Sequence, residues 1–160
     1  MQLEIITTGG TIDKVYFDAK SDFQVGAPQI NEVLRDANLC IDYRVTPLLR
    51  KDSLDLTDAD REAIRAVIAG AQQTRVVVTH GTDTMTDTAR VLASIPDKTI
   101  VLTGSLSPAR FAATDASFNV GMAFAAAQTL PPGVYVAMSG QVFDGLKVRK
   151  DVEANRFVEC

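Results

Sequence analysis

A chain of 160 residues is long enough to form one domain with its own hydrophobic core. Hydrophobic residues make up 46% of it, and at a formal net charge of −4 no run of Lys or Arg is dense enough to indicate nucleic acid as a partner. No apolar stretch reaches the ~18 residues of a membrane span, and the N-terminus enters a predicted strand at once, so we expect a cytoplasmic protein without a membrane partner. The two cysteines, Cys40 and Cys160, form no spaced motif and are expected to be free thiols.

Apolar runs of strand length alternate along the chain with stretches of helical periodicity. Strands are predicted at residues 3–8, 41–49, 75–79, 99–103 and 134–138. Helices are predicted at residues 30–37, from the N-cap Thr57 to about 71, at 84–93 and around 118–125. Residues 13–28 are predicted to form a loop, and residues 142–150 a short strand or a hairpin around Asp144 and Gly145. The buried stripe of the last helix is predicted to be Phe118, Gly121, Met122 and Ala125.

Nearly unbroken apolar strands that alternate with helices are typical of a parallel sheet covered on both faces. The expected fold is therefore a three-layer, Rossmann-like α/β sandwich with a mostly parallel sheet, as a single domain over residues 1–160. Polar clusters follow four of the predicted strands, at residues 8–11, 50–55, 80–83 and 104–105. Because ligands bind at the carboxyl ends of such strands, these clusters are expected to line one crevice.

Several common kinds of site are excluded by missing motifs. The chain has neither G-x-x-x-x-G-K-[ST] nor G-x-G-x-x-G, the two phosphate-binding loops, and it lacks the G-x-S-x-G nucleophile elbow. Its single histidine and two distant cysteines cannot form a typical zinc site. The acidic run of Asp52, Asp55, Asp58 and Asp60 could suggest a metal, but helix capping explains the last two better.

Hydroxyl groups, one well-placed carboxylate and lysines remain as candidates for chemistry. Thr82 and Asp83 follow the strand at 75–79, and Thr11 follows two glycines that permit a tight turn with exposed N–H groups. A threonine hydroxyl is a weak nucleophile until a base takes its proton, and a desolvated, paired lysine can be that base. Spacing alone leaves the choice among the three lysines Lys14, Lys147 and Lys150 open.

Two motifs then resemble the signatures of the bacterial-type L-asparaginase family: Thr8-Gly9-Gly10-Thr11-Ile12, and His80-Gly81-Thr82-Asp83-Thr84-Met85. Three further segments resemble other elements of that family, namely residues 52–57, residues 104–119 and Asp144-Gly145-Leu146-Lys147-Val148-Arg149-Lys150. The last one corresponds to the family's D-G-R-x-V-x-K element, which carries the catalytic lysine. The resemblance covers nearly the whole chain but only the family's N-terminal domain.

The resemblance implies a role for each matching residue. Thr11 is the implied nucleophile and Tyr16 its activator, a place for which Phe23 competes without a hydroxyl. The implied triad is Thr82, Asp83 and Lys150, in which the lysine accepts a proton and Thr82 activates Thr11 or water. The implied substrate-binding residues are Gly10, Asp52, Ser53, Gly81 and Ser105, with Asp83 also contacting the substrate amine. Leu54 stands where relatives often have Ser or Gln, and His80 is implied to be positional rather than catalytic.

The function implied is hydrolysis of L-asparagine to L-aspartate and ammonia, without a cofactor or metal. Alternatives are a glutaminase or other ω-amidase, and a non-catalytic amino-acid-binding module. Most relatives continue into a C-terminal domain, which this chain is expected to lack as a short-chain form. Because a site that lacks one wall commonly completes it with a symmetric copy, we expect a homo-oligomer, either a dimer or a tetramer.

Overall fold

Six strands form the central sheet, in the order β4-β1-β5-β6-β7-β8. The computed structural model describes residues 1–20 and 22–160. The strands are β1 (Gln2–Gly9), β4 (Asp42–Lys51), β5 (Arg75–Thr79), β6 (Thr99–Thr103), β7 (Gly133–Met138) and β8 (Gln141–Asp144). All neighbouring pairs are parallel except β7 and β8, so β8 is an antiparallel edge strand.

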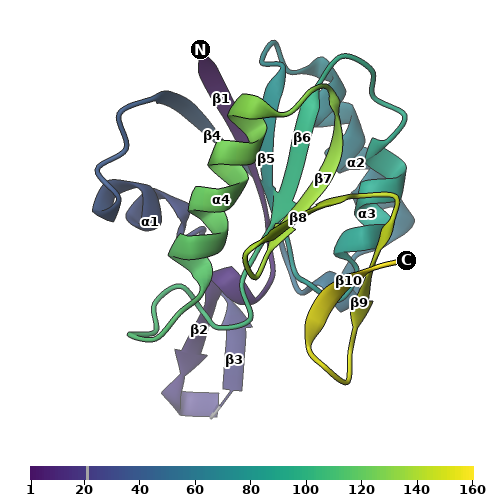
Figure 1. The fold of residues 1–160 in the computed structure, drawn as a ribbon. Coiled ribbons are helices and arrows are strands. Elements are labelled where there is room, and N and C mark those ends of the chain that lie inside the picture. Colours follow the sequence, from purple (N-terminus) through teal and green to yellow (C-terminus); the bar gives the residue numbers. More distant parts are fainter. Residues whose placement is uncertain (21) are drawn as a thin grey trace.

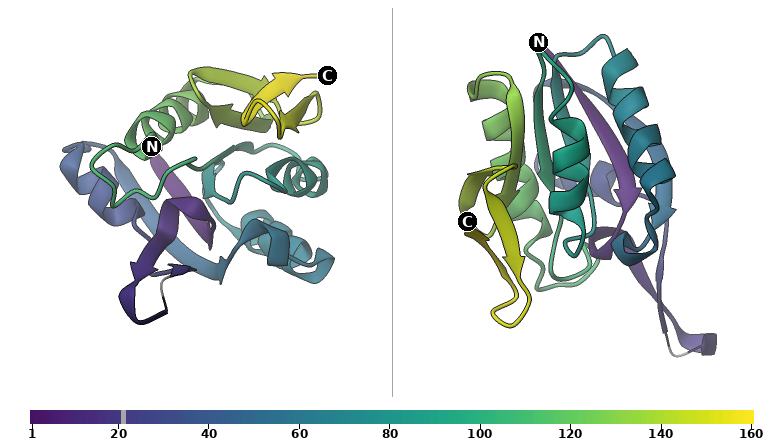
Figure 2. Two further views of the ribbon diagram at one scale, coloured as in Figure 1. Left: turned by 90° about the horizontal axis from the view of Figure 1, so that it is seen from below. Right: turned by 90° about the vertical axis from the view of Figure 1, so that its right-hand side faces the viewer.

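Helices cover both faces of this sheet and make the three-layer α/β domain that the sequence predicts (Figures 1 and 2). Helices α1 (Ile30–Asp36) and α4 (Ala116–Thr129) pack on one face with the odd-numbered side chains of β1. Helices α2 (Asp58–Gly70) and α3 (Met85–Leu92) pack on the other face with Ile6. No helix within residues 1–20 and 22–160 is long and apolar enough to cross a membrane.

The buried strands explain why the sequence reads as continuous apolar runs. In β5, Val76, Val77 and Val78 are all fully buried, because Val77 faces α1 and α4 whereas its two neighbours face α2 and α3. A strand covered on both faces needs apolar residues at every position, and β-branched side chains pack well on a pleated surface. The central strands therefore carry the core of both layers.

Helix α2 begins at the predicted N-cap. Thr57 Oγ1 accepts a hydrogen bond from the Asp60 backbone N–H, and the Asp60 carboxylate accepts one from the Thr57 N–H, which makes a capping box. Lys51 Nζ also lies 2.8 Å from Asp60 Oδ2, and this hydrogen bond is the main cause that lowers the pKa of Asp60 to about 2. These contacts join the last residue of β4 to the first turn of α2.

The connection through α4 has the opposite hand to the other crossovers. The chain moves in the same direction along the sheet from β5 to β6 and from β6 to β7, yet α3 and α4 lie on opposite faces. Such a connection is rare, because the twist of strands favours one hand. Here the fully buried Asn119 amide donates to Gly104 O and accepts from the Ser139 N–H, and thereby ties the end of β6 to the residue after β7.

Two predictions for the strands and loops need correction. Residues 13–28 are not a plain loop, because β2 (Lys14–Phe17) and β3 (Asp22–Val25) pair as an antiparallel hairpin. For residues 142–150, the alternative of a short strand is confirmed by β8, which ends at Asp144, and the alternative of a hairpin is wrong. Strand β9 (Val148–Asp151) pairs instead with β10 (Arg156–Glu159) in a separate two-stranded sheet.

The predicted stripe of α4 is on the wrong face. Phe118 is 64% exposed, and Gly121 and Ala125 are also exposed. The side chains that α4 buries are Ala116, Asn119, Val120, Ala123, Phe124, Ala126 and Ala127. Because this helix is apolar on nearly every side, periodicity does not mark the buried face. Cys40 and Cys160 are free and exposed, as predicted.

Asp13 precedes the hairpin of residues 14–25 and is hydrogen-bonded to the residues that follow it. Asp13 O accepts a hydrogen bond from the Gly26 N–H at 2.7 Å, and Asp13 Oδ1 accepts one from the Gln29 N–H at 2.9 Å. The carboxyl group is 2% exposed, and burial raises its pKa from 3.8 to about 6, against the opposing effects of the Gln29 N–H and of Arg50. The native state therefore holds a proton on Asp13 at pH values where the unfolded chain has released it.

We expect Asp13→Asn to stabilise the fold at neutral pH but not at acid pH. A pKa raised from 3.8 to about 6 means that stability falls as pH rises through that window, by about 3 kcal/mol in total. Asparagine keeps the acceptor for Gln29 and removes the buried charge, so the gain should reach about 2 kcal/mol at pH 8, after the cost of a buried amide N–H. Urea unfolding at pH 4, 6 and 8 measures it. A difference between variant and wild type that stays constant with pH would contradict the assignment.

Candidate active site

The ends of three strands meet closely at two glycines, Gly10 and Gly81. Gly10 has a φ of 86°, and a Cβ at this position would stand against the Gly81 nitrogen and 2.5 Å from the Gly81 Cα. A Cβ at Gly81 would in turn lie 2.6 Å from both Cβ and Oγ of Ser53. Such distances are below van der Waals contact, so only glycine fits at either position. The structure therefore brings together the residues that follow β1, β4 and β5, as the sequence predicts.

The only histidine is buried below this meeting point. His80 is fully buried, its Nδ1 lies 2.7 Å from Gly81 O, and its Nε2 lies 2.8 Å from Thr88 Oγ1. Because a carbonyl oxygen can only accept, Nδ1 carries the proton and Nε2 accepts from the threonine hydroxyl. Burial lowers the pKa of His80 to about 4, so the ring is neutral near pH 7. Both nitrogens are used to hold the backbone after β5 against α3.

Lys150, near the C-terminal end of the sequence, contacts two residues that follow β5. Its Nζ lies 2.7 Å from Thr82 Oγ1 and 2.5 Å from Asp83 Oδ1. The lysine side chain is 10% exposed and the Asp83 side chain 42%. Lys150 and Asp83 are 67 positions apart in the sequence, so the fold alone joins these three residues in one hydrogen-bonded group.

The sheet of β9 and β10 positions this lysine. Lys150 pairs in register with Phe157, so the two side chains share a face, as does Val148 two residues earlier. Val148 and Phe157 are buried in the same core cluster as α3. Figure 1 shows β9 beside α3. The apolar side chains therefore hold the strand on the domain, and Lys150 extends from the same face.

The other two lysine candidates have different partners. Lys14 Nζ lies 2.8 Å from Asp52 Oδ2, and Lys147 Nζ lies 3.7 Å from Asp144 Oδ2 on the surface. Spacing along the chain is compatible with all three lysines, and the structure places Lys150, the lysine that the motif resemblance implies, beside Thr82 and Asp83.

Asp52 and Ser53 form the wall on the β4 side. Partial burial opposes ionisation of Asp52, but hydrogen bonds from Lys14 and from the Leu54 N–H outweigh it and hold the pKa of the carboxyl below its usual value. Ser53 is 1% exposed, and its Oγ has no hydrogen-bond partner among the described residues. Thr84 Oγ1 donates to Ser53 O at 2.8 Å, a contact that no sequence signal predicted. The neighbouring Leu54 is exposed.

Two further predicted site residues, Ser105 and Tyr16, have different surroundings. Ser105 is buried after β6, where its hydroxyl donates to Ser107 O. Tyr16 is on the β2–β3 hairpin, half exposed, with its ring 5.3 Å from that of its cross-strand partner Phe23. Phe23, the alternative candidate for the role of Tyr16 as activator of Thr11, is thus directly beside it. The rings continue to Phe111, at 5.9 Å from Phe23.

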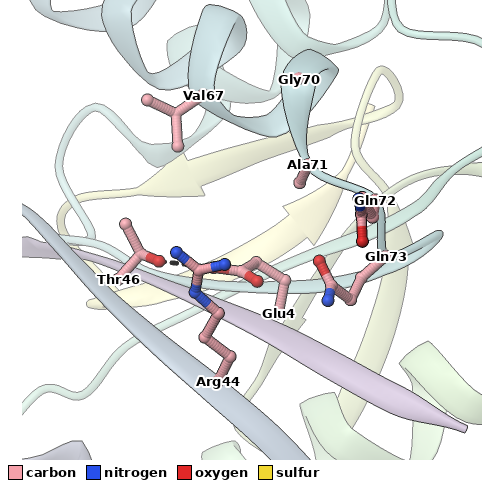
Figure 3. Close-up of a pocket in the computed structure, with 8 residues that line it drawn as sticks. All are labelled: Glu4, Arg44, Thr46, Val67, Gly70, Ala71, Gln72 and Gln73. Carbon is pink, nitrogen blue, oxygen red and sulfur yellow. Dashed lines mark hydrogen bonds between the residues drawn. The ribbon is translucent and has the colours of Figure 1, made fainter.

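A groove of about 470 Å³ borders the site between the hairpin and the end of β4. Its lining includes Lys14, Phe23, Asp52 and Leu54. A different cavity of about 400 Å³ lies near the amino ends of β1 and β4, below the last turn of α2 (Figure 3). There Glu4 accepts a hydrogen bond from Thr46. Of these two hollows, the first is the one lined by a predicted substrate-binding residue, Asp52, so we expect the chemistry beside it.

Comparisons with known proteins match this arrangement. The family model for the N-terminal domain of asparaginases matches residues 2–157. An L-asparaginase of Thermococcus kodakarensis is 32% identical over 158 residues, which cover 94% of this chain and 48% of that protein. A glutaminase-asparaginase of Acinetobacter glutaminasificans is 28% identical, covering 92% of this chain and 49% of that protein.

The solved structure of a probable cytoplasmic L-asparaginase from Campylobacter jejuni is 27% identical and has a TM-score of 0.84, covering 99% of this chain and 53% of that one. The chain therefore spans about half the length of the relatives it matches. Its sheet order and strand-end glycines are compatible with that match over its whole length. This chain belongs to the asparaginase family, and it corresponds to the family's N-terminal domain.

Proposed function

We propose that the protein hydrolyses L-asparagine to L-aspartate and ammonia, with Thr11 as nucleophile and Thr82, Asp83 and Lys150 as the triad. The observation that carries the proposal is the contact of one lysine nitrogen with both Thr82 Oγ1 and Asp83 Oδ1. This group lies next to the turn of Thr11, because Gly10 and Gly81 are in backbone contact. Two hydroxyls, a carboxylate and an amine are the groups that an acyl transfer without a metal needs.

In the first half-reaction, Thr11 Oγ1 attacks the side-chain amide carbon of asparagine. Lys150, which must be the uncharged amine at this point, accepts the hydroxyl proton through Tyr16 or Thr82, and the proton reaches the amide nitrogen as the C–N bond breaks. The C–O bond to Thr11 forms, and ammonia leaves. Asp83 keeps Lys150 oriented and balances its charge while the proton is held. The product is an aspartyl ester on Thr11.

In the second half-reaction, a water molecule enters after ammonia has left and hydrolyses that ester. Thr82 and Lys150 take a proton from the water, which attacks the ester carbon, and Thr11 leaves as a hydroxyl. The carbonyl oxygen becomes negative in both steps, and backbone N–H groups at Gly10, Thr11 and Thr82 are our candidates for its stabilisation. Aspartate is released.

The substrate's polar ends need partners at the same place. We assign the carboxylate to Ser53, whose buried Oγ lacks a partner within the described chain, and the amine to Asp83. An unpartnered buried hydroxyl is costly unless a ligand satisfies it. We also assign backbone contacts with the substrate to Gly10 and Gly81. Asp52 supplies a second negative charge, and Ser105 lies near the leaving amide in this proposal.

Replacing the acting groups should abolish turnover without unfolding the protein. We expect Thr11→Val to lower kcat by about a thousandfold or more, and Thr82→Val and Lys150→Met by about a hundredfold or more. Ammonia release from L-asparagine measures this. Thr129→Val, an exposed threonine at the far end of α4, is the matched control and should keep wild-type rates. Equal rates for wild type and Thr11→Val would exclude the mechanism. Calorimetric binding of L-aspartate without turnover would indicate an amino-acid-binding module instead.

Glutamine is the competing substrate, since the relative from Acinetobacter glutaminasificans is called a glutaminase-asparaginase. A site that holds the carboxylate and amine at fixed points discriminates one methylene by about 10–200-fold. We expect kcat/KM for L-asparagine to exceed that for L-glutamine within this range. Measuring both under the same conditions decides the assignment, and the reverse order would make the protein a glutaminase.

We also propose that the protein is a cytoplasmic homo-oligomer, either a dimer or a tetramer. Exposed apolar side chains gather at the hairpin and the groove beside the site, where the rings of Tyr16, Phe23 and Phe111 adjoin one another and Phe23 and Leu54 line the groove. Apolar side chains gathered in this way mark interaction surfaces. The similarity to the Campylobacter jejuni protein, which is called a probable cytoplasmic L-asparaginase, supports the cytoplasmic location.

Light scattering during size-exclusion chromatography should give the mass of two or four chains. The active fractions should coincide with that mass, because a second copy would cover the exposed border of the site. A fully active species with the mass of one chain would show that no symmetric partner is required.

A further inference from the structure

The turn that carries Thr11 also closes the base of the β2–β3 hairpin. Thr11–Asp13 is a single 3₁₀ turn, in which the Asp13 N–H donates to Gly10 O. The chain leaves this turn for the hairpin and returns to it, because Asp13 accepts from both Gly26 and Gln29. The first of these bonds uses the backbone, and the second uses the carboxylate. Any movement of the hairpin base is therefore transmitted to the turn of Thr11.

A second layer of contacts extends from Gln29 to the segment after β6. The Gln29 side chain is 4% exposed, and its Oε1 accepts a hydrogen bond from Arg110 Nε at 2.9 Å. The Ala109 N–H donates to Ile12 O at 3.1 Å, in the middle of the Thr11 turn. At the tip of the hairpin, Phe23 contacts Phe111. The hairpin and residues 109–111 are thus joined at the base by polar contacts and at the tip by rings.

Apart from these contacts, the hairpin is attached by the ion pair of Lys14 with Asp52. Its aromatic residues Tyr16, Phe17 and Phe23 are all exposed, and none of its described residues belongs to either core cluster. Figures 1 and 2 show β2 and β3 projecting from the body of the domain. An element without buried apolar side chains depends on its polar contacts for a fixed orientation. The Asp13 carboxylate supplies such a contact to the Gln29 N–H, beyond the end of β3, where the chain returns from the hairpin to the start of α1.

We propose that Asp13 is a positioning residue for the reaction: its carboxylate holds Gln29 on the turn of Thr11, closes the segment that contains the hairpin of residues 14–25, and so sets where Tyr16 stands relative to the Thr11 hydroxyl. This inference rests on the proposed function, since it assigns Tyr16 and Thr11 the roles given above. Asp13 touches no reacting atom. A misplacement of about 1 Å at a reacting group can cost a hundredfold in rate, so a residue at the hairpin base can matter as much as one in the site.

The buried carboxylate itself supports a functional role. A carboxyl group with its pKa raised by burial lowers stability at neutral pH, and such groups gather at functional sites. Alanine at this position removes both the acceptor of the Gln29 N–H and the buried charge. The two effects on stability have opposite signs and similar size, so Asp13→Ala should unfold close to the wild-type temperature.

The test compares Asp13→Ala with two controls. Asp13→Asn keeps the acceptor, and Asp22→Ala removes an exposed carboxylate of the same hairpin whose one hydrogen bond within the described chain is to the N–H of its neighbour Phe23. We expect Asp13→Ala to lower kcat for L-asparagine by about tenfold to a hundredfold with a smaller change in KM. We expect Asp13→Asn and Asp22→Ala to stay near the wild-type rate.

Hydrogen exchange read by mass spectrometry gives a second measurement that does not depend on activity. In Asp13→Ala, the amides of residues 14–25 should exchange faster, while those of β5 and β6 keep their protection. Wild-type kcat and unchanged exchange in Asp13→Ala would overturn the proposal, as would equal damage by Asp13→Asn. Absence of turnover in the wild type would overturn the proposed function, and the exchange data would still decide whether Asp13 fixes the hairpin.

Discussion

Close contact of backbone with backbone at the strand ends is the constraint on which the rest of the site depends. Gly10, Gly81 and Ser53 touch directly, and a Cβ at Gly104 would likewise strike His80 O. With ordinary side chains there, the ends of β1, β4, β5 and β6 would be forced apart. The order in which strands are added to the sheet reverses between β1 and β5, since β4 lies on one side of β1 and the later strands lie on the other. A parallel sheet has a ligand-binding crevice at such a reversal, and the glycines let the strand ends approach one another closely there.

The triad is held by apolar packing more than by its own charges. An ion pair with one partner 42% exposed contributes about 1 kcal/mol or less, whereas burying side chains such as Val148 and Phe157 contributes about 1.5–3 kcal/mol each. The geometry around Lys150 Nζ is therefore a consequence of where β9 and β10 pack. Removing the charged end of Lys150 from water opposes its contact with Asp83. The apolar packing of β9 and β10 is therefore needed to hold Lys150 there.

Local patterns predicted the parts of this structure that local forces determine. The central strands, the Thr57 cap and the polar residues after each strand follow from runs of β-branched residues and from capping chemistry. The buried face of α4 could not be predicted in this way, since Phe118 and Phe124 are equally apolar and only the sheet decides between them. The pairing of Lys150 with Asp83 and of Lys14 with Asp52 depends on contacts between distant parts of the chain, which spacing does not encode. The motif resemblance identified Lys150 because it carries information about the fold that periodicity lacks.

The two hairpins that border the site are attached by different forces, and the difference matters for catalysis. The β9–β10 pair is fixed by buried apolar side chains, so the lysine that it carries keeps one position. The β2–β3 pair is fixed by polar contacts at its base and by exposed rings at its tip. Segments with few buried apolar contacts open at a lower free energy than the core does. In the proposed reaction, the proton-transferring lysine must stay in place through both half-reactions, whereas an element over the nucleophile must let asparagine enter and aspartate leave. Buried apolar packing behind Lys150 and polar attachment behind Tyr16 suit these two proposed roles.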